Sequence, residues 1–116
     1  MTDIYHNPRC TKSRQTLALL EKNNIPTNII DYISQPPDVV TLRLLVKQLG
    51  LSPRDLLRKN EVIYKELGLK NESLTDTVLL QAMSQYPKLI ERPIVVYSDK
   101  AKLGRPPEAV MELFDL

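Results

Sequence analysis

The one cysteine of the chain, Cys10, lies in the polar stretch Arg-Cys-Thr-Lys-Ser-Arg, between a predicted strand and a predicted helix. Its sulfur is therefore expected near free backbone N–H groups and the positive end of a helix dipole. The cations Arg9, Lys12 and Arg14 favour the thiolate further. An ordinary thiol with a pKa near 8.5 is about 3% ionised at pH 7, whereas a pKa of about 6.5 makes it about three-quarters thiolate. Cys10 is thus a candidate nucleophile.

Each of these residue types also has a plainer interpretation. A lone cysteine is most often a small buried apolar residue, but the neighbours of Cys10 provide almost no apolar surroundings. His6, the only histidine, lies four residues earlier at the end of the predicted strand. It can either tune the thiol or form a partly exposed polar end of the strand, and both interpretations remain open.

Three arginines form a second candidate group. Arg92 and Arg105 each precede a proline, which favours extended and rigid backbone at both positions. Arg58 follows a pair of leucines. Guanidinium groups held in this way could bind a tetrahedral oxyanion from several directions. Any one of them alone could be a surface charge, which is our interpretation of Arg43 and Arg54.

The elements that must position these residues are strands and helices near both ends of the chain. Strand-forming residues at 3–6 and 27–32 flank a helical pattern over 11–24, which predicts a β-α-β unit with parallel strands. The continuous apolar run over 94–97 indicates a buried strand. A turn then leads to a return strand over 101–104, and a helix is predicted over 108–116.

The middle of the chain is predicted to be helical. Apolar spacing and terminating residues favour helices over 42–49, 52–57, 61–67 and 75–86. The predicted fold is therefore α/β, with the order β-α-β, a helical insertion over about 35–91, and β-β-α. A length of 116 residues favours one domain covering 1–116.

Composition excludes several classes of function. Sixteen basic and fourteen acidic residues give a net charge of +2, which disfavours a nucleic-acid partner. No apolar run approaches the roughly 20 residues of a membrane span, and no signal peptide is visible, so we expect a cytoplasmic protein with no membrane partner. One cysteine allows neither an internal disulfide nor a four-ligand zinc site.

Four separated motifs carry a resemblance that covers essentially the whole chain. They occur at 5–14 (YHNPRCTKSR), 56–60 (LLRKN), 91–96 (ERPIVV) and 103–108 (LGRPPE). In this order they resemble those of the glutaredoxin-coupled arsenate reductases. The resemblance implies a thioredoxin-like fold with a helical insertion, in agreement with the order of elements predicted above.

The resemblance also implies roles for individual residues. Arg9 and Thr11 stand where well-studied members have a small residue and a glycine, respectively. The bond between Arg92 and Pro93 matches the cis-proline position of the fold. The implied site comprises the nucleophile Cys10, the pKa-tuning His6, the oxyanion-binding Arg58, Arg92 and Arg105, and the loop-lining Asn7 and Ser13.

The function implied is the reduction of arsenate to arsenite through a Cys10–arsenic adduct. Glutathione as co-substrate and glutaredoxin would supply the electrons, with no bound cofactor and no metal. One alternative is a redox-sensing regulator of the Spx type, but Ser13 stands where such regulators commonly have a second cysteine. Another is a general glutaredoxin-like thiol-disulfide protein, which would not require the three arginines to converge.

Overall fold

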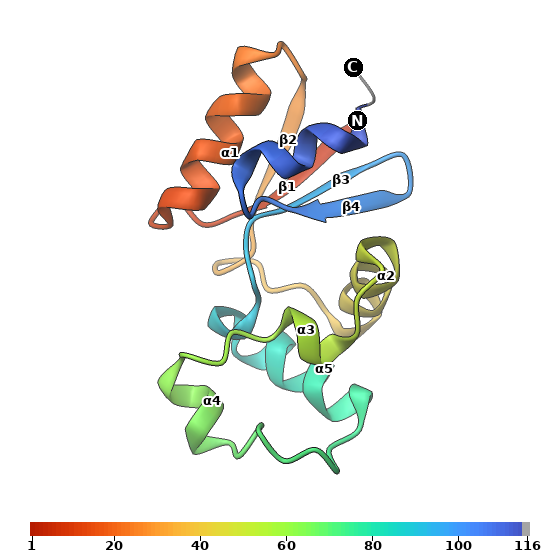
Figure 1. Ribbon diagram of the computed structural model, residues 1–116. Coiled ribbons are helices and arrows are strands. Elements are labelled where there is room, and N and C mark those ends of the chain that lie inside the picture. The colour runs from red at the N-terminus through yellow and green to blue at the C-terminus, as the bar shows by residue number, and fades with distance from the viewer. Residues whose placement is uncertain (115–116) are drawn as a thin grey trace. The chain divides into compact units, whose positions relative to one another are not determined.

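A four-stranded mixed sheet contains both strand-forming parts of the chain, as the computed structural model of residues 1–114 shows (Figure 1). The strand order is β2-β1-β3-β4. β1 pairs parallel with β2 and antiparallel with β3, which pairs antiparallel with β4. The bounds are Thr2–His6 for β1, Thr27–Asp31 for β2, Ile94–Tyr97 for β3 and Lys100–Leu103 for β4.

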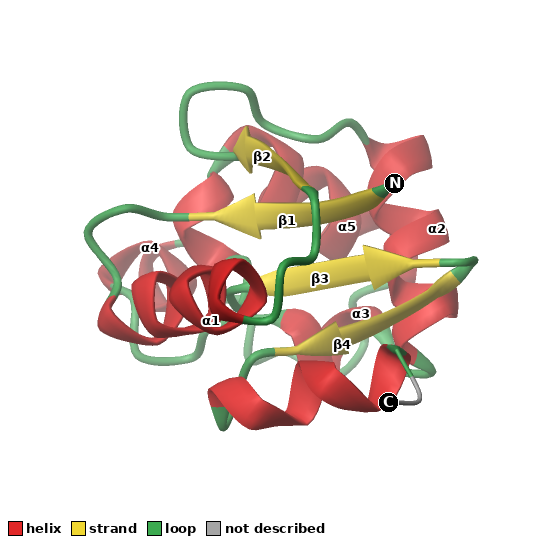
Figure 2. Cartoon of the chain, turned by 90° about the horizontal axis from the view of Figure 1, so that it is seen from above, coloured by secondary structure: helices red, strands yellow, loops and turns green. Residues whose placement is uncertain are grey.

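The helix α1, Thr11–Lys22, connects the two parallel strands, so the predicted β-α-β unit is confirmed. It lies beside the C-terminal 3₁₀ helix η2, Pro107–Leu113, on one side of the sheet (Figure 2). Their inward faces meet the sheet in one apolar cluster. Its fully buried members are Ile4, Leu20, Val95 and Val110.

The C-terminal segment differs from its prediction. An α-helix was expected over 108–116, but the structure has a 3₁₀ helix that begins at the second of two prolines, Pro107. The N–H of Ala109 donates to the carbonyl of Pro106 at 3.0 Å. The three-residue spacing of Val110 and Leu113 suits 3₁₀ geometry as well as an α-helix, so the apolar pattern did not distinguish them. Residues 115–116 lie outside the described residues.

The return strand of the β3–β4 hairpin begins one residue earlier than expected. Tyr97 pairs with Lys100, which leaves a two-residue turn formed by Ser98 and Asp99. Their φ angles are +52° and +65°, as a type I′ turn requires. The strand predicted over 101–104 is therefore found at Lys100–Leu103.

Residues 36–91 form a second compact unit, distinct from the unit that contains the sheet. Side chains near the helix N-termini cap helices of this unit. The carboxylate of Asp38 accepts the N–H of Thr41 at 2.8 Å, and Ser52 and Asp55 form a capping box. Helices are present in all four predicted places, while the expectation of one domain over 1–116 stays a prediction. The bounds are Val39–Leu49 (α2), Pro53–Leu56 (α3), Val62–Glu66 (α4), Asp76–Gln85 (α5) and Pro87–Leu89 (η1).

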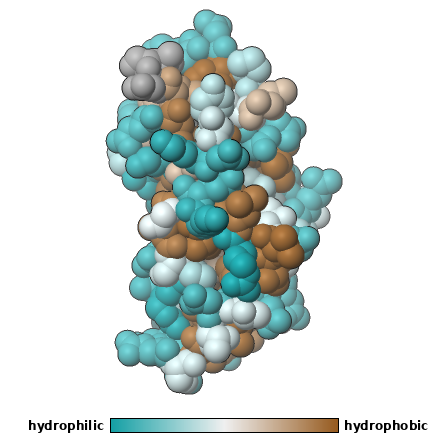
Figure 3. All heavy atoms as spheres, turned by 90° about the vertical axis from the view of Figure 1, so that its right-hand side faces the viewer, coloured by the Kyte–Doolittle hydropathy of each residue, from teal (hydrophilic) through white to brown (hydrophobic). Residues whose placement is uncertain are grey.

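The surface is mixed in character, and Figure 3 shows hydrophilic side chains interspersed with apolar ones on one face. Exposed large apolar residues include Val40 and Leu44 of α2 and Val62 of α4. Within residues 1–114, none of the helices combines the length and the apolar character that crossing a bilayer requires.

Candidate active site

Cys10 lies where strand β1 has ended and helix α1 begins. The chain leaves β1 at His6 and turns, and the N–H of Cys10 donates to the carbonyl of Asn7 at 3.0 Å. The carbonyl of Cys10 accepts the N–H of Arg14 at 3.0 Å, which starts the helical hydrogen bonding. Cys10 is thus the N-cap residue of α1, and its partly exposed side chain lies at the helix terminus.

The environment of Cys10 stabilises its thiolate. Burial by itself raises the pKa of the thiol, but several donors act against burial. They are the backbone N–H of Ser13, the guanidinium of Arg92 through a hydrogen bond and its charge, and the backbone N–H of Lys12. Together these donors lower the pKa of Cys10 below the ordinary value for a cysteine.

The rate of Cys10 alkylation by iodoacetamide is therefore expected to rise and level off at lower pH than the alkylation of N-acetylcysteine in the same buffers. The reason is that only the thiolate reacts, and the donors around the sulfur favour that form. The measurement is the alkylation rate of the intact protein between pH 5 and about 10. An inflection at or above about 8.5 would contradict an activated thiol.

The loop before Cys10 is connected to the first turn of α1 through Ser13. The hydroxyl oxygen of this fully buried serine accepts the N–H of Asn7 at 3.0 Å and lies 2.6 Å from Nδ1 of His6. The side-chain oxygen of Asn7 accepts the N–H of Arg9 at 3.0 Å. The predicted loop residues Asn7 and Ser13 thus hold the backbone around Cys10, and their role toward substrate stays a prediction.

His6 is only 7% exposed, which does not fit a partly exposed strand end. Burial lowers the pKa of His6; the nearby carboxylate of Asp31 opposes this shift and the charge of Arg14 adds to it. The ring is therefore mainly neutral near pH 7. Any effect of His6 on Cys10 would accordingly pass through the hydrogen bond to Ser13, and the predicted tuning role stays a prediction.

Because His6 is the only histidine, one NMR resonance reports its titration. Its midpoint is expected below about 6.5, since the folded protein favours the neutral ring. As pH falls below about 6.5, the unfolded state gains the proton first, so the free energy of unfolding decreases until the folded pKa is passed. Urea titrations should show this decrease in the wild type and not in His6→Gln. A midpoint above 6.5 would contradict the assignment.

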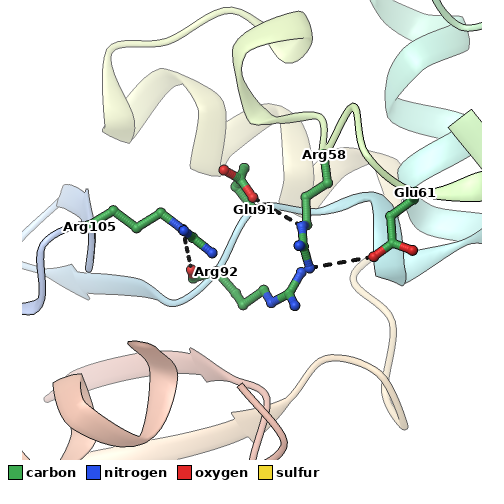
Figure 4. A network of polar contacts seen from close by, with 5 residues as sticks. All are labelled: Arg58, Glu61, Glu91, Arg92 and Arg105. Atoms are coloured by element: carbon green, nitrogen blue, oxygen red, sulfur yellow. Dashed lines mark hydrogen bonds and ion pairs between the residues drawn. The ribbon is translucent and has the colours of Figure 1, made fainter. Parts of the chain in front are cut away.

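Two arginines predicted from the sequence, Arg92 and Arg105, lie together, and the convergence of Arg105 on the sulfur stays a prediction. The guanidinium of Arg92 lowers the pKa of Cys10 through hydrogen bonding and its charge. The Nε of Arg105 donates to the carbonyl oxygen of Arg92 at 3.1 Å (Figure 4). The expected cis bond between Arg92 and Pro93 is confirmed, and a second one precedes Pro106. Nε of Arg92 is buried and has no hydrogen-bond partner among residues 1–114.

Gly104 keeps this arginine segment close to α1, a role that the sequence analysis missed. Its N–H donates to the carbonyl of Pro93 at 2.9 Å. A Cβ at this position would lie 2.7 Å from Cγ of Pro93 and would also collide with the hydroxyl of Thr16. Its place within the motif at 103–108 was the available signal, since glycine in a strand often marks close backbone approach.

Gly104→Ala is expected to destabilise the protein by about 1–3 kcal/mol, because Pro93 or α1 must move to admit the methyl group. The same movement should weaken the contact between Arg92 and Cys10 and raise the pH of half-maximal alkylation. Urea unfolding and the alkylation profile measure the two effects. Lys100→Ala, an exposed position four residues earlier on β4, is the control. Wild-type values for Gly104→Ala would show that close packing here is unimportant.

Arg58 belongs to the unit of residues 36–91. Its N–H donates to the carbonyl of Leu89 at 2.7 Å, beside an isolated bridge between Leu57 and Ile90. Its guanidinium lies 3.3 Å from the carboxylate of Glu91 and 3.5 Å from that of Glu61 (Figure 4). The structure therefore gives this arginine two acidic partners, and its convergence on Cys10 stays a prediction.

No group of three or more histidine, cysteine, aspartate or glutamate residues in the described chain could hold a metal ion. The reactive group of the site is the stabilised thiolate of Cys10 at a helix terminus, with the guanidinium of Arg92 as its nearby cation. Such a site can attack an electrophilic centre that carries anionic oxygens, since the same cation stabilises both the nucleophile and the anion.

The sheet order, the thiolate at the start of α1 and the cis-proline next to Arg92 define a thioredoxin-like fold. A sequence profile of the ArsC family matches residues 5–113, and the chain belongs to that family.

Known relatives cover nearly the whole chain. "Uncharacterized protein YfgD" of Escherichia coli K12 is 53% identical over 95% of this chain and 93% of its own length. "Arsenate reductase" of Haemophilus influenzae is 47% identical over 95% of this chain and 96% of its own length. The solved structure "Arsenate reductase from Vibrio cholerae" has a TM-score of 0.95 at 50% identity, covering 97% of this chain and 96% of that one.

Proposed function

We propose that this protein reduces arsenate to arsenite and takes its electrons from glutathione and glutaredoxin. The observation that carries the proposal is the lowered pKa of Cys10 at the start of α1, to which the guanidinium of Arg92 contributes. Membership of the ArsC family and the names of relatives at 45–47% identity support arsenate as the substrate. The glutathione requirement places the reaction in a reducing compartment, and we propose the cytoplasm.

In the first step the Cys10 thiolate attacks arsenic. A sulfur–arsenic bond forms, one arsenic–oxygen bond breaks, and the hydroxide that departs takes up a proton to become water. Arg92 would bind the oxygens that remain, because a guanidinium matches an oxyanion with two parallel N–H donors. Arg105 would hold the backbone of Arg92 in place, and Arg58 would contribute a further charge at the oxyanion.

In the second step glutathione provides the thiol that the chain lacks. The disulfide bond between Cys10 and glutathione forms as the sulfur–arsenic bond breaks. The two electrons, formally one from each sulfur atom, go to arsenic, and the thiol proton goes to the arsenite that is released. The thiolate of glutaredoxin then takes the glutathionyl group, and Cys10 returns to its thiolate form. With one cysteine in the sequence, the second sulfur must come from outside the chain.

The test is arsenite formation by purified protein, measured by chromatography with arsenic-specific detection. Arsenate with glutathione and glutaredoxin is expected to give continuous arsenite formation. Omission of glutathione, or its replacement by thioredoxin with its reductase, is expected to give none. Continued turnover with thioredoxin alone would overturn the proposed electron donors, and no turnover with any thiol would overturn arsenate as the substrate.

The glutaredoxin-like alternative makes a different prediction. A general thiol-disulfide protein would reduce a small disulfide such as hydroxyethyl disulfide, and this activity would not depend on an oxyanion-binding arginine. Under our proposal Arg92→Gln is expected to lose arsenate reduction. If the wild type has no arsenate reduction and reduces the disulfide equally well with or without Arg92, the alternative is the better account.

A further inference from the structure

A groove of about 530 Å³ runs along the exposed side of α1, next to the start of η2. Its residues on α1 begin with Lys12, two positions after Cys10, and continue to Lys22. The opposite side is formed by Pro106, Pro107 and Glu108. Figure 2 shows α1 and the C-terminal helix next to each other on one side of the sheet.

Sheet topology places the 106–108 side of the groove at the end where Cys10 lies. β4 is antiparallel to β3, which is antiparallel to β1, so β1 and β4 point the same way. The segments that follow them, to Cys10 and to Pro106, therefore leave the sheet at the same edge. Arg92 provides a second link between these two segments. Its carbonyl accepts a hydrogen bond from Arg105, next to Pro106, and its guanidinium acts on the pKa of Cys10.

The polar side chains at this end of the groove are available to a ligand. Lys12, Gln15 and Glu108 are exposed, and within residues 1–114 none of their side chains has a hydrogen-bond or ion-pair partner. Lys12 and Glu108 provide opposite charges on the two sides, and Pro106 and Pro107 add apolar surface on the Glu108 side. This pattern fits a short zwitterionic group.

We propose that this end of the groove binds the γ-glutamyl arm of glutathione. The inference rests on the proposed function, which requires a glutathione thiol at Cys10. The arm has an α-carboxylate, which would bind Lys12 and the amide of Gln15, and an α-ammonium, which would bind Glu108. It is about 7 Å long, the length of about two extended residues, so it can lie beside Lys12 while its own thiol lies at Cys10.

The far end of the groove is outside the reach of this arm. Lys22 follows Lys12 by ten residues, which is about 15 Å along a helix. The groove therefore contains two lysines on the same helix, of which only the first is close enough to bind the arm. A comparison of the two lysines therefore distinguishes a specific subsite, which needs only Lys12, from a general attraction between anions and a basic surface, which would involve both.

The first experiment is a binding measurement that needs neither arsenate nor turnover. S-methylglutathione, which cannot react, is titrated into the Cys10→Ser protein while backbone NMR shifts are followed. Shifts are expected at residues 12–15 and 106–108. Lys12→Gln and Glu108→Gln should each weaken binding about two- to fivefold, the effect of one exposed ion pair. Lys22→Gln and the exposed Lys65→Gln of α4 are charge-matched controls expected to bind as the parent does.

The second experiment removes parts of the ligand instead of the protein. S-methyl-γ-glutamylcysteine keeps the proposed arm and should bind as S-methylglutathione does. S-methylcysteinylglycine lacks the arm, so it should bind more weakly and should not respond to Lys12→Gln. Equal effects of Lys12→Gln and Lys22→Gln, shifts that map elsewhere, or equal binding of both analogues would overturn the inference. None of these results depends on whether arsenate is the substrate, so a failure here is distinct from a failure of the proposed function.

Discussion

Cys10→Ser is expected to lose arsenite formation by a factor on the order of 10⁴ or more under all donor conditions, because a serine hydroxyl stays protonated near neutrality and cannot replace the thiolate. The measurement is the steady-state rate with glutathione and glutaredoxin at saturating arsenate. The same variant should form no mixed disulfide with glutathione when analysed by intact-protein mass spectrometry.

The loss in Cys10→Ser cannot be attributed to unfolding if stability is measured beside it. Serine is among the preferred N-cap residues, so helix α1 should begin as in the wild type and the urea midpoint should be unchanged or higher. Arsenite formation by this variant above the rate of the buffer would contradict Cys10 as the nucleophile.

Arg92→Lys is expected to lower kcat/KM for arsenate about 10²- to 10³-fold, the usual cost of removing a donor to a developing oxyanion. Lysine keeps the positive charge but cannot make two parallel hydrogen bonds to the anion. It also cannot reproduce the geometry of the guanidinium contact with the sulfur, so the pKa of Cys10 should rise. Arg92→Gln removes the charge as well and should raise the pKa of Cys10 further.

The matched control is Arg43→Lys on α2. Arg43 also donates a side-chain hydrogen bond, from Nη2 to the hydroxyl of Thr77 at 3.1 Å, but it belongs to the unit of residues 36–91 and was interpreted as a surface charge. Arg43→Lys is expected to leave both kcat/KM for arsenate and the alkylation profile of Cys10 unchanged. Wild-type kinetics for Arg92→Lys, or an equal loss in both variants, would show that Arg92 does not bind the oxyanion.

Features that depend on neighbouring residues were predictable from the sequence. Cys10 lies at the start of a helix because a proline-containing turn ends the preceding strand, and both signals lie within ten residues of the cysteine. The β-α-β unit and the tight turn after Tyr97 followed in the same way, since their patterns are local. The lowered pKa of Cys10 follows partly from this position, through the N–H groups of Lys12 and Ser13.

Features that depend on contacts between distant segments were not predictable from local patterns. The contact of Arg92 with Cys10 spans more than eighty positions of the chain, and only the resemblance to a known family indicated it. The bond from Arg105 to the Arg92 backbone had no local signal. The glycine at 104 indicated a close backbone approach, but not that its partners are Pro93 and Thr16. The neutral state of His6 depends on burial, which a sequence does not show directly.

The hydrogen bonds that stabilise the Cys10 thiolate act at both ends of the proposed cycle. After arsenite is released, Cys10 is the sulfur that must depart from the mixed disulfide when glutaredoxin attacks the glutathione sulfur. A thiol with a low pKa is the better leaving group, so the N–H groups of Lys12 and Ser13 and the guanidinium of Arg92 favour that departure. They also favour attack by glutaredoxin on the glutathione sulfur, since this attack expels the more stable Cys10 thiolate. A helix terminus that activates the nucleophile therefore also limits the time for which the protein stays glutathionylated.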